Sequence, residues 1–396
     1  MKYRLSDCVE IISGGTPKKS IKDYWGGNVP WLTIKDFTSK YPKTVSSYIT
    51  KTGLNNSSAK ITKDKDILIS ARGTVGEIMM VHSGYTFNQS IYGLRVKENL
   101  AIPEYIYYWL LANNQMFSQN VHGSVFDTIT RKTFDYIQID LPELSKQAKI
   151  VTKLNNIDSK ISVNERINDN LLKLAKTKFW QIYLLPTDEF KMVPNGWEIA
   201  SFSKIMTFSN GHNFKSNEML KKYEPLTYKV FKQGNILIGG GLNELGTKSW
   251  IQKGKVTKLN KYVLKKWDLL MAMTDMKNKV AILGNTALMN CSNQYILNQR
   301  VGLIRSNNYN GTSPAYLFLL TNSKPFLHSI RSKAHSGVQV NLSSKEIRDT
   351  DVIIAPKNVN DGFNTFVKPI FDRIMVNQLE NLTLNELKQT LLNRLF

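Results

Sequence analysis

The chain has 396 residues, of which 42 % are hydrophobic and 10 % aromatic, enough to form more than one hydrophobic core. No stretch comes near the ~18 apolar residues of a membrane span, and the first ten residues turn polar too early for a signal peptide. Two cysteines, Cys8 and Cys291, are too few for a disulfide scaffold or a thiolate zinc site. We therefore expect a cytoplasmic protein that does not contact a membrane.

The charge of the chain favours a polyanionic partner. Lysine and arginine number 53 against 31 aspartates and glutamates, which gives a net charge of +22. An excess of this size concentrates polyanions near the protein and accelerates their encounter with it. Solubility in a basic proteome is the alternative explanation. Because no basic amphipathic helix points to a membrane surface, nucleic acid is the partner that the charge favours.

The first part of the chain combines short β patterns with one helix pattern. The β patterns lie at 66–70, 86–96 and 137–141, and the helix pattern at 103–120 begins with Pro103, a residue suited to a helix N-terminus. A much longer helical pattern then starts. We predict an α+β lobe of residues 1–143, followed by a spacer helix of residues 144–185.

The second part of the chain repeats the first, with four matches in the same order. Asp66–Ser70 returns as Asp268–Ala272, Asn88–Arg95 as Asn298–Arg305, Pro103–Leu111 as Pro314–Leu320, and the strand that ends in Pro142 as the strand that ends in Pro356. An internal repeat of this kind indicates two copies of one structural unit. We predict a second lobe of residues 186–357 and a second spacer helix of residues 358–396.

Both long helices carry inward-facing positions that alternate three and four residues apart, which is the heptad seam of a coiled coil. These positions are Ile150, Leu154, Ile157, Ile161, Asn164, Asn168, Leu171, Ala175, Lys178 and Ile182 in the first helix, and Phe363, Val367, Ile370, Ile374, Asn377, Asn381, Leu384, Lys388, Leu391 and Leu395 in the second. An asparagine pair interrupts both seams at the same place, and polar seam residues fix register and partner. We predict an antiparallel coiled coil with helices about 50–60 Å long. The alternative is two unrelated helices, each packed on its own lobe.

Sequence motifs of catalysis are missing. A target-amine loop of a DNA methyltransferase, with two prolines before an aromatic residue, does not occur. The stretch 241–249 resembles a phosphate-binding loop but has one residue too many before its lysine. The five histidines show no metal-ligand spacing. We therefore expect a binding protein with no catalytic residue and no metal site of its own.

Several motifs of the first lobe and helix resemble those of a known family. They are Ser13–Pro17, Tyr24–Trp31, Ser57–Lys60, Ile67–Gly76, Asn88-Gln89 and Leu141-Pro142, followed on the helix by Gln147, Ile150, Leu154, Asp158 and Ile161. With them the chain resembles the specificity subunit of type I restriction–modification enzymes over essentially its whole length. The likeness thins in the second lobe, where Met273–Asp275 takes the place of Arg72–Thr74, and the second helix lacks the usual glutamine near Asp361.

The resemblance implies a function and a set of partners. Each lobe would be a target-recognition domain that reads one half of a bipartite double-stranded DNA site, and the helices would set the gap and dock the methyltransferase subunits. The resemblance implies no cofactor in this chain. Two methyltransferase (modification) subunits would use S-adenosylmethionine, and restriction subunits would use ATP and Mg²⁺ to cleave DNA.

Candidate DNA-binding residues lie near the glycine-flanked motifs. In the first lobe Arg72 is the best candidate, since arginine can bond guanine with both arms; Thr74 shares its turn, and Lys18, Lys19 and Lys35 suit phosphates. The parallel candidates in the second lobe are Lys277, Lys279, Arg300 and Gln339. Structural roles compete with each assignment, as a strand-end arginine or as solvated lysines. Asn88-Gln89 recurs in both lobes, which favours a structural role for that pair.

Two other classes of function stay open at this stage. The chain could be a restriction endonuclease with an unrecognised catalytic site, in which case the purified chain alone would cut DNA with Mg²⁺. It could also be a paired-lobe scaffold for RNA or protein, with incidental charge. Binding to RNA but not to double-stranded DNA at moderate salt would favour the scaffold.

Overall fold

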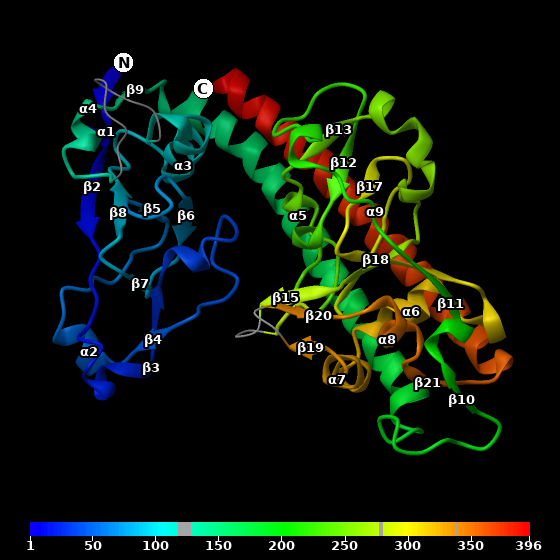
Figure 1. Cartoon of the computed structure of the whole chain (residues 1–396). Coiled ribbons are helices and arrows are strands. Elements are labelled where there is room, and N and C mark those ends of the chain that lie inside the picture. The colour runs from blue at the N-terminus through cyan, green and yellow to red at the C-terminus, as the bar shows by residue number, and fades with distance from the viewer. Residues whose placement is uncertain (118–127, 277–279, 337–338) are drawn as a thin grey trace. The chain divides into compact units, whose positions relative to one another are not determined.

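The computed structural model in Figure 1 describes residues 1–117, 128–276, 280–336 and 339–396. The chain divides into two compact units. The first consists of Met1–Ser162 with Leu382–Phe396, and the second of Val163–Asn381. Each unit therefore contains one lobe and a part of both long helices.

The lobe of the first unit is built on a four-stranded antiparallel sheet of order β2-β8-β5-β6, a three-stranded sheet of order β4-β3-β7, and the pair β1-β9 (Figure 1). Only β3 and β7 pair in parallel in this lobe's described part. The elements are β1 (Lys2–Arg4), α1 (Leu5–Cys8), β2 (Val9–Ser13), β3 (Trp25–Leu32), β4 (Tyr48–Ile49), α2 (Lys51–Asn55), β5 (Asp66–Ser70), β6 (Ile78–Val81), β7 (Thr86–Phe87), β8 (Ile91–Val96), α3 (Pro103–Ala112), α4 (Thr133–Tyr136) and β9 (Gln138–Asp140).

The lobe of the second unit repeats this arrangement: β11-β18-β14-β16, β13-β12-β17 and β10-β21, with a further sheet β15-β20-β19. Again β12 and β17 pair in parallel. The elements are β10 (Glu198–Ser201), β11 (Met206–Asn210), β12 (Thr227–Phe231), β13 (Trp250–Gln252), β14 (Leu269–Ala272), β15 (Thr274–Met276), β16 (Thr286–Leu288), β17 (Tyr295–Leu297), β18 (Val301–Ser306), α6 (Pro314–Thr321), α7 (Lys324–Ser332), β19 (His335–Ser336), β20 (Gln339–Asn341), α8 (Ser344–Arg348) and β21 (Asp351–Ile354). The predicted α+β fold with two similar lobes is confirmed.

Two long helices follow the lobes. The first, α5 (Leu144–Phe179), continues through a π-helical turn, Trp180–Leu184, and the second is α9 (Lys357–Leu395). The short helix predicted at 103–120 ends earlier, because α3 stops at Ala112. Asn113 terminates it by donating its side-chain amide to the carbonyl of Trp109, a local bond that competes with helix continuation.

The cores join each lobe to the helices of its own unit. In the first unit Leu154 of α5 and Leu392 of α9 are buried in the same cluster as Ile106 of α3. In the second unit Phe179 and Phe363 are buried with Tyr316 of α6. Burial of such large apolar side chains contributes about 1.5–3 kcal/mol each. The helices are therefore part of the lobe cores, not independent rods.

A buried amide also holds the start of each long helix. Gln147 is fully buried, donates to the carbonyls of Pro142 (2.9 Å) and Leu100 (3.2 Å), and accepts from the N–H of Ile102. Asn360 does the same in the second unit, donating to the carbonyls of Ala355 (3.1 Å) and Asn310 (2.8 Å). The glutamine that the second helix lacks in sequence is thus replaced by an asparagine one residue before Asp361.

Candidate nucleic-acid interface

Four segments of the first lobe meet where β2 and β5 end and β8 begins. We call residues 13–16, 32–33, 71–74 and 88–90 the lobe 1 rim. Backbone hydrogen bonds hold these segments together, from Gly14 N to Ile91 O (3.3 Å), from Ala71 N to Ser90 O (2.8 Å) and from Asn88 N to Leu32 O (3.1 Å). The rim therefore assembles residues that are up to 77 positions apart in the chain.

The second lobe builds the same rim with the same three bonds. They run from Gly211 N to Val301 O (3.3 Å), from Met273 N to Arg300 O (3.3 Å) and from Asn298 N to Phe231 O (3.1 Å). We call residues 210–213, 231–233, 273–276 and 298–300 the lobe 2 rim. A Cβ at Gly14 or Gly211 would lie 2.1 Å from the carbonyl oxygen of Asn88 or Asn298, so both rims require glycine at this point.

Arg72 is the exposed arginine of the lobe 1 rim. Its guanidinium has neither a hydrogen-bond nor an ion-pair partner in the described part of the chain. The turn that carries it contains two glycines with positive φ, Gly73 (79°) and Gly76 (87°), and Ser70 closes it by accepting from Glu77 N (2.8 Å) and donating to Thr74 O. Thr74 is exposed in the same turn. The turn after β5 thus presents Arg72 to solvent, without a partner among the described residues.

Arg300 lies on the lobe 2 rim beside a pocket of about 290 Å³. The pocket is lined by Lys232, Gln233, Thr274, Asp275, Met276, Asn298, Gln299 and Arg300. Arg300 is exposed and has a φ of 71°, a left-handed conformation that costs a non-glycine residue about 1–3 kcal/mol. Burial lowers the pKa of Lys232, whose Nζ donates to Ser249 Oγ at 2.9 Å. Lys232 and Arg300 outnumber Asp275 among the charged residues of the lining, so the charge of the pocket is basic.

Three residues of the pocket wall use their polar groups in hydrogen bonds within the lobe. Gln233 donates to the carbonyl of Thr274 (2.6 Å) and accepts from its hydroxyl (2.7 Å). The Asp275 carboxylate accepts from the backbone N–H groups of residues 281–283 at 2.7–3.2 Å, and Arg331 donates to the carbonyls of residues 281 and 283. Gln233, Thr274 and Asp275 therefore shape the site, whereas the Arg300 guanidinium has no partner among the described residues.

Strand pairing corrects the sequence comparison of the two rims. By motif, Met273 stood in the place of Arg72. In the structure Arg72 pairs with Thr128 and Thr274 pairs with Asn341, and the bond from Ile129 N to Ala71 O returns as Leu342 N to Met273 O. The counterpart of Arg72 is therefore Thr274. The offset that aligns Asp66–Ser70 with Asp268–Ala272 gives the same pairing when it continues without a gap, so the strand pairing agrees with the repeat and not with the motif comparison.

The other predicted contact residues lie as follows. All three candidate lysines of lobe 1, Lys18, Lys19 and Lys35, are exposed, and Lys35 lies two residues after the rim segment 32–33. Gln339 lies on β20 and pairs with Met276 of the lobe 2 rim. Lys277 and Lys279 lie outside the described residues. The recurrent asparagines fill structural roles, since Asn88 accepts from the N–H of Ser90 at 3.0 Å and Asn298 donates to Gln299 O.

The asparagines of the helix seam bond to one another in the second unit. Asn164 donates to Asn381 (2.9 Å), and Asn377 donates to Asn168 (2.8 Å). The higher-numbered asparagine of α5 thus bonds to the lower-numbered asparagine of α9, so the two helices run antiparallel here. The apolar seam residues Ile150, Leu154, Ile157, Ile370 and Ile374 are buried, and Ile161 is half-buried.

A half-buried polar cluster in the first unit was not anticipated from the sequence. Lys40, from the loop before β4, donates to Tyr108 (2.9 Å) and Asn155 (2.6 Å), while Asp158 accepts from Tyr108 (2.6 Å) and Lys388 (2.8 Å). Desolvation lowers the pKa of Lys40. The cluster ties lobe 1 to α5 and α9. A lysine in a polar loop carries no signal of such a role.

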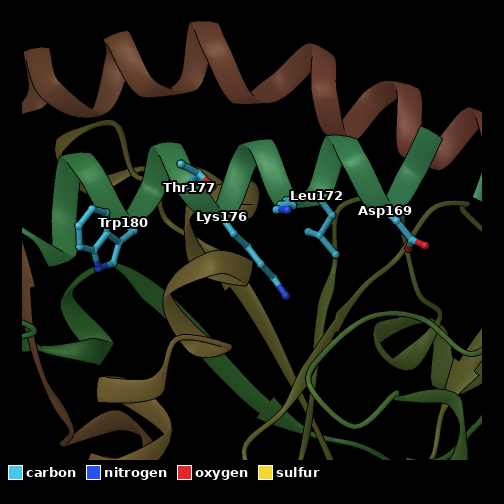
Figure 2. A pocket seen from close by; sticks show the side chains of 6 residues that line it. Asp169, Leu172, Lys176, Thr177 and Trp180 are labelled. Carbon is cyan, nitrogen blue, oxygen red and sulfur yellow. The ribbon is translucent and has the colours of Figure 1, made fainter. Parts of the chain in front are cut away.

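A groove of about 480 Å³ follows one face of α5 in the second unit, lined by Asp169, Leu172, Lys173, Lys176, Thr177 and Trp180. Figure 2 shows Leu172, Lys176 and Trp180 on the side of α5 turned away from α9. Trp180 is 43 % exposed. Large aromatic side chains of this kind are enriched where proteins bury each other's surfaces.

Two further features bear on the class of the protein. Within the described ranges, no three His, Cys, Asp or Glu side chains gather in a way that could hold a metal ion. None of the described helices is both long and apolar enough to cross a membrane.

Known proteins share this architecture. The family described as "Type I restriction modification DNA specificity domain" matches residues 1–173 and 194–395. The type I restriction enzyme MjaIX specificity subunit of Methanocaldococcus jannaschii is 25 % identical, over 99 % of this chain and 91 % of that protein. The MjaVIII specificity subunit of the same organism is 24 % identical, over 76 % and 69 %. The crystal structure of a type I restriction-modification S subunit from M. genitalium has the same fold, with a TM-score of 0.58 at 13 % identity over 100 % and 96 % of the two chains.

Proposed function

Because the chain belongs to the family of type I restriction modification DNA specificity domains, we propose that it selects a bipartite double-stranded DNA site and reads one half with each rim. Its role is DNA specificity, not catalysis, as in the specificity subunits that it matches. The observation that carries the finer proposal is the repeated rim, in which three backbone bonds recur around different side chains. One scaffold with two sets of exposed groups suits two half-sites.

The two helices are the element that sets the gap between the half-sites. The 36 residues of α5 span about 54 Å at 1.5 Å per residue. Such a length is commensurate with half-sites about one helical turn of DNA, or somewhat more, apart. The buried asparagine pairs support this role, since polar seam residues hold one register and a fixed register gives a fixed gap.

The partners follow from the same proposal. Two methyltransferase subunits would dock on the helices, and the groove beside Trp180 is the surface of α5 that we assign to one of them. Restriction subunits would complete the complex. S-adenosylmethionine, ATP and Mg²⁺ would belong to these partners and not to this chain. We expect the complex to act on DNA in the cytoplasm.

The other two functions receive less support. An endonuclease would need its own acidic site, whereas the exposed groups of both rims are basic or neutral, apart from Asp275, which is bonded to backbone. An RNA or protein scaffold would not need two rims of matched geometry. Family membership favours DNA specificity over both.

Co-expression of the full chain with its methyltransferase subunit, followed by mapping of methyladenine, tests the proposal. We expect a motif of two half-sites with a constant gap, which disappears when this chain is omitted. Methylation that persists unchanged without the chain would contradict it. Purified chain incubated with DNA and Mg²⁺, and separately with RNA, tests the two alternatives.

A further inference from the structure

We propose that each lobe reads a guanine with the single arginine of its rim, and that this arginine stands at different structural positions in the two lobes. In lobe 1 it is Arg72, in the turn after β5; in lobe 2 it is Arg300, in the turn before β18. The inference rests on the proposed function and deepens it, because it names residues that would make the two half-sites differ.

The structural equivalence of the rims defines the two positions. Ser90 O accepts from Ala71 N in lobe 1, and Arg300 O accepts from Met273 N in lobe 2, so Arg300 occupies the place of Ser90. By strand pairing Thr274 occupies the place of Arg72. Each rim therefore has one arginine and one short hydroxyl residue at these two places, in exchanged order.

Both arginines are available to a ligand. Arg72 and Arg300 are exposed, and neither guanidinium has a partner among the residues that the structure describes. The sheet arginines are occupied: Arg95 binds Asp66 with two bonds (3.0 and 2.8 Å), and Arg305 binds Asp268 likewise (2.6 and 2.8 Å). The chain thus neutralises one arginine per lobe with a carboxylate and leaves the rim arginine without one.

The backbone of lobe 2 is adapted to its arginine. In lobe 1 the N–H of Ser90 donates to Asn88 Oδ1, but Asn298 Oδ1 is buried and has no hydrogen-bond partner within the described part of the chain. Arg300 instead adopts a φ of 71°, a conformation that proteins retain mainly at functional sites. Thr274 is short and bonded to Gln233, so it leaves the 290 Å³ pocket beside Arg300 open.

Guanine is the base that this chemistry selects. Its O6 and N7 face the major groove as two adjacent acceptors, and an arginine fork bonds both. Lysine keeps the charge but cannot reproduce the paired geometry. Since Arg72 follows β5 and Arg300 precedes β18, the two arginines occupy different places on equivalent rims, and the guanine would stand at different base steps in the two half-sites.

Conservative variants of the full chain, in complex with its methyltransferase subunits, separate base reading from charge. The probe is a duplex library with both half-sites randomised, and the bound fraction is sequenced. We expect Arg72→Lys to lower the preference for guanine at one position of one half by about 5- to 150-fold and to leave the other half unchanged. Arg300→Lys should do the same in the other half only.

An exchange variant tests the position itself. Arg72→Thr combined with Ser90→Arg reproduces the lobe 2 order in lobe 1, and we expect the guanine preference to move to another base step of the same half. Arg4→Lys and Arg348→Lys are matched controls, because both residues are exposed and outside the rims.

The outcomes separate the inference from the proposed function. If the unchanged chain selects a bipartite site but both lysine variants keep its guanine preference, or lose affinity equally for all sequences, the inference is wrong and the proposed function stands. If the unchanged chain selects no sequence, the proposed function itself fails.

Discussion

At the scale of single residues, a buried asparagine can take the place of a buried glutamine when its amide bonds to the same kind of backbone groups. Gln147 and Asn360 both donate to the carbonyl of a residue just before the long helix and to one just before the lobe's proline-initiated helix. Asn360 in addition accepts from the hydroxyl of Tyr183 at 2.8 Å. Each amide therefore connects the start of the long helix to the segment before the proline-initiated helix of its lobe.

Asn360→Ala should therefore destabilise the second unit. The variant removes the hydrogen-bond partner of the Tyr183 hydroxyl and of the carbonyls of Asn310 and Ala355. Each buried group left without a partner costs about 1–3 kcal/mol. We expect a lower midpoint in chemical denaturation. Asn358→Ala, at an exposed position of the same helix turn, is the control and should not change the midpoint. Equal midpoints for both variants would show that the amide bonds contribute nothing.

Lys18 and Lys19 allow a prediction about affinity at the same scale. Both are exposed next to the lobe 1 rim, and we expect them to contact phosphates. Replacing both with alanine should weaken binding to all sequences and reduce the slope of log K against log salt by about one per lost contact. Lys2→Ala is the control. A change of half-site preference would instead make these lysines base contacts.

At the scale of elements, the seam of α5 and α9 combines burial with polar bonds. Asn168 and Asn377 bond across the helices, and Asn164 bonds Asn381 and Glu380. Apolar residues in these places would pack at least as well, so the asparagines are better explained by register than by stability.

A double-mutant cycle on Asn168 and Asn377 measures this coupling. Asn377→Leu alone leaves the side-chain amide oxygen of Asn168 without its donor and should destabilise the second unit by about 1–3 kcal/mol. The pair Asn168→Leu with Asn377→Leu should cost less than the sum of the single changes. Asn170→Leu, on the exposed face of α5, is the control. Additive effects in the denaturation midpoints would rule out the coupling.

At the scale of the whole molecule, the proposed spacer can be shortened without touching either core. Segments 159–165 and 380–386 oppose each other in the seam by the pairing of Asn164 with Asn381, and neither contributes to the core clusters of the described residues. The bond between Asp158 and Lys388 and that between Asn168 and Asn377 lie just outside these segments.

Deleting both segments should shorten the recognised gap and keep both half-sites. Seven residues correspond to about 10 Å of helix, or about three base pairs. Methyladenine mapping of the co-expressed complex reads the gap directly. A deletion in one helix only, as the control, breaks the pairing and should abolish selection. Altered half-site bases in the double deletion would show that the helices are not merely spacers.

Periodicity and repetition in the amino-acid sequence predicted the two lobes, the antiparallel helices and the inward-facing asparagines. They could do so because these patterns reflect burial at regular intervals along one stretch of chain. The left-handed backbone of Arg300 and the cluster of Lys40 with Asp158 and Lys388 could not be obtained in this way. They depend on hydrogen bonds between segments that are distant in the chain, and such bonds are formed only when the tertiary structure brings the segments together.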